Sequence, residues 1–152
     1  MRLLVESVLP SVDLPEPGTL LDVGSGNGSP GLVMALLRDD LDVTLLEPRT
    51  RRWAFLREAA RHSGEGRVRV LRGRHDTYAG APVRTVTMRA LALPLAELAP
   101  LVAPGGRVVI LGGRPLLDGP FEEESDAGGG PGGTRVFRRL SANVSRGTSP
   151  AE

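Results

Sequence analysis

Short apolar runs alternate along the chain with longer segments in which apolar residues recur every three or four positions. Short apolar runs are typical of buried strands, and the longer spacing is typical of amphipathic helices. Strands that alternate with helices predict an α/β fold with a mostly parallel sheet. The expected strands are Thr19–Val23, Asp42–Glu47, Val68–Gly73, Val83–Met88, Arg107–Leu111 and Thr134–Leu140. The expected helices are Pro30–Asp40, Thr50–Ser63 and Leu93–Val102.

The second expected helix has an apolar stripe and a basic remainder. Its apolar residues Trp53, Leu56 and Ala60 are spaced i, i+3, i+7, so they share one face and predict its buried side. Gly64 is the expected stop signal. The arginines of this helix lie largely off the stripe, at Arg51, Arg52, Arg57 and Arg61.

Two segments near the C-terminus lack this patterning. Residues 118–133 combine an acidic run with GGGPGG, a composition that cannot fill a core and predicts a mobile loop. Residues 141–152 predict a disordered tail. A length of 152 residues fits one domain, which we assign to residues 1–140.

The composition excludes several classes of function. There is no Cys, which rules out disulfides, thiolate metal sites and cysteine nucleophiles. The two histidines lack nearby paired acids and make a poor metal site, so no metal is expected. No apolar run approaches the roughly 18 residues needed to span a membrane. Prolines and acids interrupt the N-terminal stretch, which argues against a signal peptide and favours a soluble cytoplasmic protein.

Charge is distributed unevenly along the chain, although the formal net charge is only +1. Residues 1–48 hold two arginines and eight acids, whereas residues 49–89 hold eleven arginines and three acids. All basic residues are Arg, which is also what a GC-rich genome would produce. Guanidinium groups bind phosphate bidentately and stack on bases, so this stretch suits an anionic polymer. Solvated surface charge explains it equally well.

The stretch LLDVGSGNGSPG, residues 20–31, leads from an apolar strand through closely spaced glycines into a helix. Such a turn admits a nucleotide-like ligand, although many such turns bind nothing. The glycines are spaced G-x-G-x-G, not the G-x-G-x-x-G of dinucleotide-binding enzymes. Asp22, just before them, would repel a pyrophosphate but suits a cationic, amine-bearing ligand. This favours S-adenosylmethionine over a nicotinamide dinucleotide.

Glu47 supports the same interpretation. It closes the second expected strand about 20 residues beyond the glycines, where an acid of a Rossmann-like unit commonly accepts hydrogen bonds from ribose hydroxyls. The alternative is a helix-capping acid before Pro48.

Four stretches in the correct order resemble the RsmG (glucose-inhibited division protein B) family: DVGSGNGSPG, TLLEPRTRRWAFLREAA, VRVLRGRHD and MRALA…LAPLVAPGGRVVILGG. These bacterial methyltransferases use S-adenosylmethionine to methylate guanine N7 of small-subunit (16S) ribosomal RNA. The similarity spans about Leu20 to Gly113. It implies a Rossmann-like class I methyltransferase fold, abbreviated at both ends, with S-adenosylmethionine as cofactor. The implied partner is ribosomal RNA or the small ribosomal subunit.

The resemblance also implies roles for particular residues. Asp22 would anchor the turn, Glu47 would bind the ribose, and Asp76 would lie near the adenine. Arg89, at the end of the fourth strand, would face the methyl-transfer site; a salt-bridged surface group is the alternative. The residues that would surround the methionine part of the cofactor are Gly24, Ser25, Gly26 and Gly28.

The chain departs from the family pattern at several points. Ser29 stands where the family has an aromatic residue, and Gly112-Gly113 stands where it has Lys-Gly, with Arg114 one residue later. Only about nineteen residues precede the first strand, and the helix and penultimate strand after the fifth strand are expected to be replaced by the Gly-rich loop. Two other functions therefore stay open: methylation of a small metabolite, and binding of S-adenosylmethionine or RNA without turnover.

Overall fold

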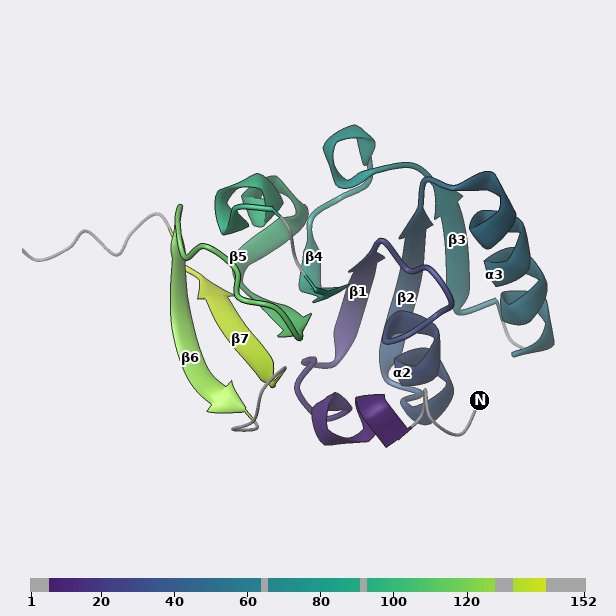
Figure 1. Cartoon of the computed structure of the whole chain (residues 1–152), viewed down its shortest axis with the longest axis horizontal. Coiled ribbons are helices and arrows are strands. Elements are labelled where there is room, and N and C mark those ends of the chain that lie inside the picture. Colours follow the sequence, from purple (N-terminus) through teal and green to yellow (C-terminus); the bar gives the residue numbers. More distant parts are fainter. Residues whose placement is uncertain (1–5, 64–65, 91–92, 128–132, 142–152) are drawn as a thin grey trace, which may run out of the picture.

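The computed structural model describes residues 6–63, 66–90, 93–127 and 133–141. Seven strands form one sheet in the order β3-β2-β1-β4-β5-β7-β6 (Figure 1). The strands are β1 (Gly18–Val23), β2 (Leu41–Glu47), β3 (Val68–Arg72), β4 (Val83–Arg89), β5 (Val102–Leu111), β6 (Phe121–Ala127) and β7 (Thr134–Arg139). Strands β1 to β5 are parallel to one another, and β7 is antiparallel to both β5 and β6. The α/β, mostly parallel fold expected from the sequence is therefore confirmed.

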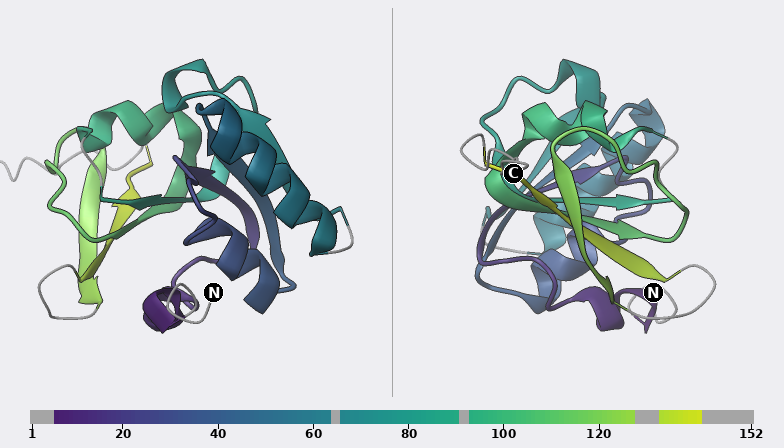
Figure 2. Two further views of the ribbon diagram at one scale, coloured as in Figure 1. Left: turned by 45° about the vertical axis from the view of Figure 1, so that its right-hand side comes forward. Right: turned by 90° about the vertical axis from the view of Figure 1, so that its left-hand side faces the viewer.

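Helices α2 (Gly31–Leu37) and α3 (Thr50–His62) cover the same face of the sheet, over β1, β2 and β3 (Figures 1 and 2). The described chain also contains three short 3-10 helices: η1 (Leu9–Ser11), η2 (His75–Thr77) and η3 (Leu95–Leu101). The expected helix near residue 95 forms as a 3-10 helix, with Pro100 inside it. The expected stop Gly64 lies outside the described residues.

Two clusters of buried apolar side chains cover the two faces of the sheet. Neighbouring residues of β1 point to opposite faces, so Leu20 belongs to the cluster under α2 and α3 while Leu21 belongs to the cluster under η3. Of the predicted buried stripe of α3, Leu56 is fully buried, whereas Trp53 and Ala60 are half-buried. Burial on both faces explains why the central strands are continuously apolar in sequence.

The structure corrects the sequence prediction at β5 and β6. Strand β5, expected over Arg107–Leu111, begins at Val102 and includes Pro104 to Gly106, with a register shift against β4. Residues 121–127, expected within a mobile loop and expected to replace the penultimate strand, instead form β6.

Paired charges explain why the acidic run forms a strand. The two Glu123 oxygens accept hydrogen bonds of 2.7 and 2.8 Å from Arg135 of β7. The carboxylate of Glu124 lies 2.8 Å from Arg107 of β5 and also pairs with Arg138. Carboxylates that looked solvated in sequence are thus bound by guanidinium groups of neighbouring strands. The remainder of the expected loop at 128–132 and the expected tail at 142–152 lie outside the described residues.

Candidate active site

The glycine turn lies at the carboxyl end of β1, in the middle of the parallel sheet. The amides of Gly24 and Ser25 donate to the carbonyl of Leu46 on β2 at 2.9 and 3.1 Å, which ties the turn to the neighbouring strand. The amide of Gly28 then donates to the Ser25 carbonyl at 2.7 Å, and α2 begins three residues later. The carboxyl edge of a parallel sheet is where α/β proteins bind their ligands.

Asp22 lies beneath this turn and is 1 % exposed. Its Oδ1 accepts a 2.7 Å hydrogen bond from the Thr87 hydroxyl on β4, and its side chain packs so closely on Gly31 that a Cβ there would lie 2.5 Å away. Burial raises the pKa of Asp22 to about 6, although the Thr87 hydrogen bond and the Arg89 charge oppose the rise. Its Oδ2 has no hydrogen-bond partner among the described residues.

Glu47, at the end of β2, is 3 % exposed and joins two loops. Its Oε2 accepts a 2.9 Å hydrogen bond from the Gly26 amide, and its Oε1 accepts one of 3.1 Å from the Arg49 amide. The carboxylate therefore holds the glycine turn against the start of α3. Each carboxylate oxygen can accept a further hydrogen bond, so a ribose hydroxyl can share this group.

An open cleft of about 580 Å³ lies beside the glycine turn. Its lining comes from three elements: the turn (Gly24, Ser25, Gly26, Asn27, Ser29), α3 (Arg51, Arg52, Phe55) and the end of β4 (Arg89, Ala90). The lining contains three arginines and no acid, so it favours an anionic group. Arg52 was placed off the buried stripe by its spacing, but its orientation towards the turn could not be predicted from sequence.

Arg89 emerges at the carboxyl end of β4, as predicted, and reaches back to the glycine turn. Its Nη2 donates to the Ser29 hydroxyl at 2.5 Å and to the Ser7 hydroxyl at 3.3 Å. No carboxylate among the described residues forms an ion pair with it, which argues against a salt-bridged surface group. The next residue, Ala90, has a φ of 51°, a left-handed conformation that non-glycine residues seldom adopt and that clusters at functional sites.

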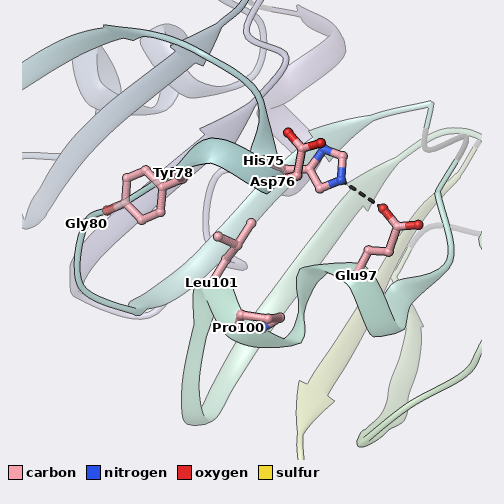
Figure 3. Close-up of a pocket in the computed structure, with 7 residues that line it drawn as sticks. All are labelled: His75, Asp76, Tyr78, Gly80, Glu97, Pro100 and Leu101. Atoms are coloured by element: carbon pink, nitrogen blue, oxygen red, sulfur yellow. Dashed lines mark hydrogen bonds and ion pairs between the residues drawn. The ribbon is translucent and has the colours of Figure 1, made fainter.

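Asp76 does not line the cleft of the glycine turn. It lies in η2 and, with His75, lines a second hollow of about 300 Å³ between η2 and η3 (Figure 3). There the imidazole of His75 lies 2.9 Å from the carboxylate of Glu97, and Arg74 lies 3.6 Å from Asp76. The Gly73 amide donates to the Glu47 carbonyl at 3.3 Å, which holds the start of the loop after β3 beside the end of β2. Arg114 is exposed and lines neither hollow.

The uneven charge of the sequence is partly neutralised in space. Arg67, Arg69 and Arg84 pair with Asp39, Asp42 and Glu16, all from the acidic first third of the chain. This happens because β3 lies beside β2, and β4 beside β1. Arg51 and Arg52 form no ion pair with any described residue. Three of the arginines without an ion-pair partner among the described residues, Arg51, Arg52 and Arg89, line the cleft beside the glycine turn.

The residues of this site fit S-adenosylmethionine. The cofactor is a nucleoside with a cationic sulfonium and an amino-acid end, and it carries no phosphate. The carboxylate of Asp22, buried beneath the turn, favours a cation nearby, and the glycine at position 24 leaves open space, with nothing within 4 Å of a Cβ built there. Thr87, which donates to Asp22, and Arg52, which lines the cleft, complete the site, and no sequence motif marked either residue.

No helix among the described residues is long and apolar enough to cross a membrane. In the same part of the chain, no three His, Asp or Glu side chains gather as metal ligands would.

Solved structures with a similar arrangement include proteins titled as methyltransferases. The chain is similar to "Putative methyltransferase yhhF" from Escherichia coli (TM-score 0.64, 16 % identity, 92 % of this chain and 85 % of that one). It is also similar to a "putative rRNA-methylase" from Clostridium thermocellum (TM-score 0.62, 17 % identity, 89 % and 96 %). These likenesses define the fold as that of class I S-adenosylmethionine-dependent methyltransferases.

Sequence comparisons assign the chain to one family within this fold. The model of the rRNA small subunit methyltransferase G (GidB) family matches residues 1–126, and the chain belongs to this family. The "Ribosomal RNA small subunit methyltransferase G" of Streptomyces avermitilis is 45 % identical over 118 residues, which are 74 % of this chain and 49 % of that protein. The protein of the same name from Salinispora arenicola is 51 % identical over 112 residues, 66 % and 46 %. The chain thus spans about half the length of these relatives.

Proposed function

We propose that this chain is an S-adenosylmethionine-dependent methyltransferase that acts in the cytoplasm on guanine N7 of 16S ribosomal RNA. The observation that carries the proposal is the closed set of contacts around the glycine turn. Asp22 lies beneath the turn, Glu47 holds it from β2, and Arg89 reaches it from β4. Membership of the rRNA methyltransferase G family supports the RNA substrate.

Each element of the site has a part in cofactor binding. The open space above Gly24, Ser25 and Gly26 accommodates the amino-acid end, and Gly28 closes the turn. Glu47 would accept hydrogen bonds from the ribose while it keeps its two backbone amides. Asp76 would lie near the adenine, on the loop after β3 that the Gly73 hydrogen bond holds beside Glu47.

The transfer step needs positioning more than proton transfer. Guanine N7 has an unprotonated lone pair, so no general base has to remove a proton before attack. When bound, the cofactor supplies an activated methyl group on a cationic sulfur. The chain's task is to hold N7 in line with the carbon–sulfur bond. Arg89 stays protonated, so it serves as a fixed donor to a phosphate or a base edge and not as a base.

The test is methyl transfer from tritiated S-adenosylmethionine to under-methylated small ribosomal subunits, with bare protein as the blank. Label recovered in 16S RNA as 7-methylguanine is the expected result. Label on small molecules of an extract, and none on the subunit, would favour a metabolite substrate. If the cofactor binds but label reaches neither the RNA nor a small molecule, the proposal that the chain is an enzyme is wrong.

Binding without turnover has one structural argument in its favour. Gly112, where the family has Lys, has a φ of 77°, a conformation suited to glycine, and Arg114 does not line the cleft in its place. The tritium assay distinguishes this case, because the cofactor would bind while no label was transferred.

A further inference from the structure

Arg52 occupies a distinctive position over the glycine turn. Its Nη1 lies 3.7 Å from the point where a Cβ on Gly26 would be, and the carbonyl oxygen of Gly24 lies 3.8 Å from the same point. A cationic donor and a neutral acceptor thus border one small volume above a residue that has no side chain to fill it. An α-amino acid group carries complementary groups, a carboxylate and an ammonium, on the same carbon atom.

The surroundings of Arg52 leave it available for a ligand. It is exposed, it lines the cleft, and it forms no ion pair or hydrogen bond with any described residue. Arg89 in the same cleft differs, because Ser29 and Ser7 already hold its guanidinium. No acid lines the cleft, so nothing there competes with an incoming carboxylate.

We propose that Arg52 binds the carboxylate of the cofactor's amino-acid end, while the Gly24 carbonyl accepts a hydrogen bond from its ammonium. The inference rests on the proposed function, since it assigns a contact to the same cofactor. The position of Glu47 supports this assignment. Its carboxylate, proposed to bind the ribose, accepts a hydrogen bond from the Gly26 amide, and the Arg52 guanidinium lies near Gly26 on the side of the cleft. A ligand fixed at the ribose therefore extends its amino-acid arm towards Arg52.

The experiment compares two nucleosides in calorimetry. S-adenosylhomocysteine carries the amino-acid end, and 5′-methylthioadenosine has the same adenosine and thioether without it. Arg52→Ala is expected to weaken the binding of S-adenosylhomocysteine about tenfold or more, because a charged hydrogen bond is lost. The affinity of methylthioadenosine should change less than about twofold, because its contacts are unaltered.

Arg57→Ala is the matched control. It removes an arginine from the same helix, but this side chain stacks over Trp53 at 4.8 Å and lines an outer hollow away from the turn. It should leave both affinities unchanged. Arg52→Lys should recover part of the S-adenosylhomocysteine affinity, since an ammonium can hold one carboxylate oxygen although it lacks the fork.

A phosphate of the RNA is the other anion that Arg52 could meet. Binding of a ribosomal RNA oligonucleotide without cofactor is therefore measured for the same variants. If Arg52→Ala weakens only the binding of RNA, or weakens the binding of both nucleosides equally, the assignment of Arg52 to the carboxylate is wrong. If the wild type binds both nucleosides equally, the assignment fails while the cofactor class survives. If it binds neither, the proposed function fails as well.

Discussion

The Ser29 hydroxyl accepts a 2.5 Å hydrogen bond from Arg89 and so joins the start of α2 to the end of β4. Ser29 is 4 % exposed, which keeps this contact out of competition with bulk water. The start of α2 therefore fixes the guanidinium that faces the cleft.

Arg89→Ala is expected to reduce methyl transfer by about two orders of magnitude, as the loss of one fixed charged donor does at other active sites. Arg89→Lys should recover little, because a point charge does not reproduce the fork. The measurements are tritium transfer, S-adenosylhomocysteine affinity and the melting temperature. Ser29→Ala is the matched variant: it keeps the guanidinium but removes its shorter hydrogen bond and leaves the one to Ser7, so a smaller loss of transfer is expected. A drop in melting temperature and cofactor affinity together in Arg89→Ala would instead indicate a structural role.

Asp22 should give the stability of the ligand-free protein an unusual pH dependence. Its pKa is raised from 3.8 to about 6 by burial, so between these values the folded protein holds this proton more tightly than the unfolded chain does. The free energy of unfolding therefore falls as pH rises from about 4 to 6, by roughly 2–3 kcal/mol, and this contribution is constant above pH 6.

Asp22→Asn isolates this effect, because the amide oxygen can still accept the Thr87 hydrogen bond. Denaturant melts of both proteins between pH 4 and 7 should show the variant gaining stability relative to the wild type as pH rises. The quantity to follow is the difference in unfolding free energy between the variant and the wild type at each pH. The wild type alone is not sufficient, since Glu16 and Glu123 have lowered pKa values and act in the opposite direction at lower pH. A difference that does not change with pH would show that Asp22 titrates normally.

Glu47→Ala should lower both cofactor affinity and stability. The amides of Gly26 and Arg49 lose their acceptor, at a cost of about 1–3 kcal/mol for buried donors, and a ribose loses its partner. Calorimetry should show S-adenosylhomocysteine binding weakened at least tenfold, with a smaller loss in Glu47→Gln, which keeps one acceptor oxygen. Binding of NADH in preference to S-adenosylmethionine by the wild type would contradict the whole assignment.

RNA affinity should depend on salt through the unpaired arginines around the cleft. The slope of log affinity against log salt is expected to fall by about 0.7 for each phosphate contact to a single strand that is lost. Arg51→Ala should show this change, because Arg51 has no acid partner in the described part of the chain. Arg69→Ala is the control, since Asp42 already lies 3.2 Å from that guanidinium. An affinity that does not vary with salt would exclude RNA as the partner.

The order of strands and helices was predictable from sequence because it depends on local periodicity. Apolar runs in β1, β2 and β4 mark strands buried on both faces, and the glycines after β1 mark a turn whatever surrounds it. The positions of Asp22, Glu47 and Arg89 followed, because a residue that ends a parallel strand must lie at the carboxyl edge of the sheet. These expectations needed only the spacing of residues along the chain.

The tertiary structure alone decided which charges meet. The acidic run of β6 looked like a solvated loop, yet Glu123 and Glu124 face arginines of β7 and β5 that lie 12 to 17 positions away in sequence. The contact of Arg89 with Ser29 spans 60 residues, and the approach of Arg52 to Gly26 joins a helix to a turn on another strand. Local periodicity fixes the face on which a side chain lies. Its partner is determined by the order of strands in the sheet and by the packing of helices upon it.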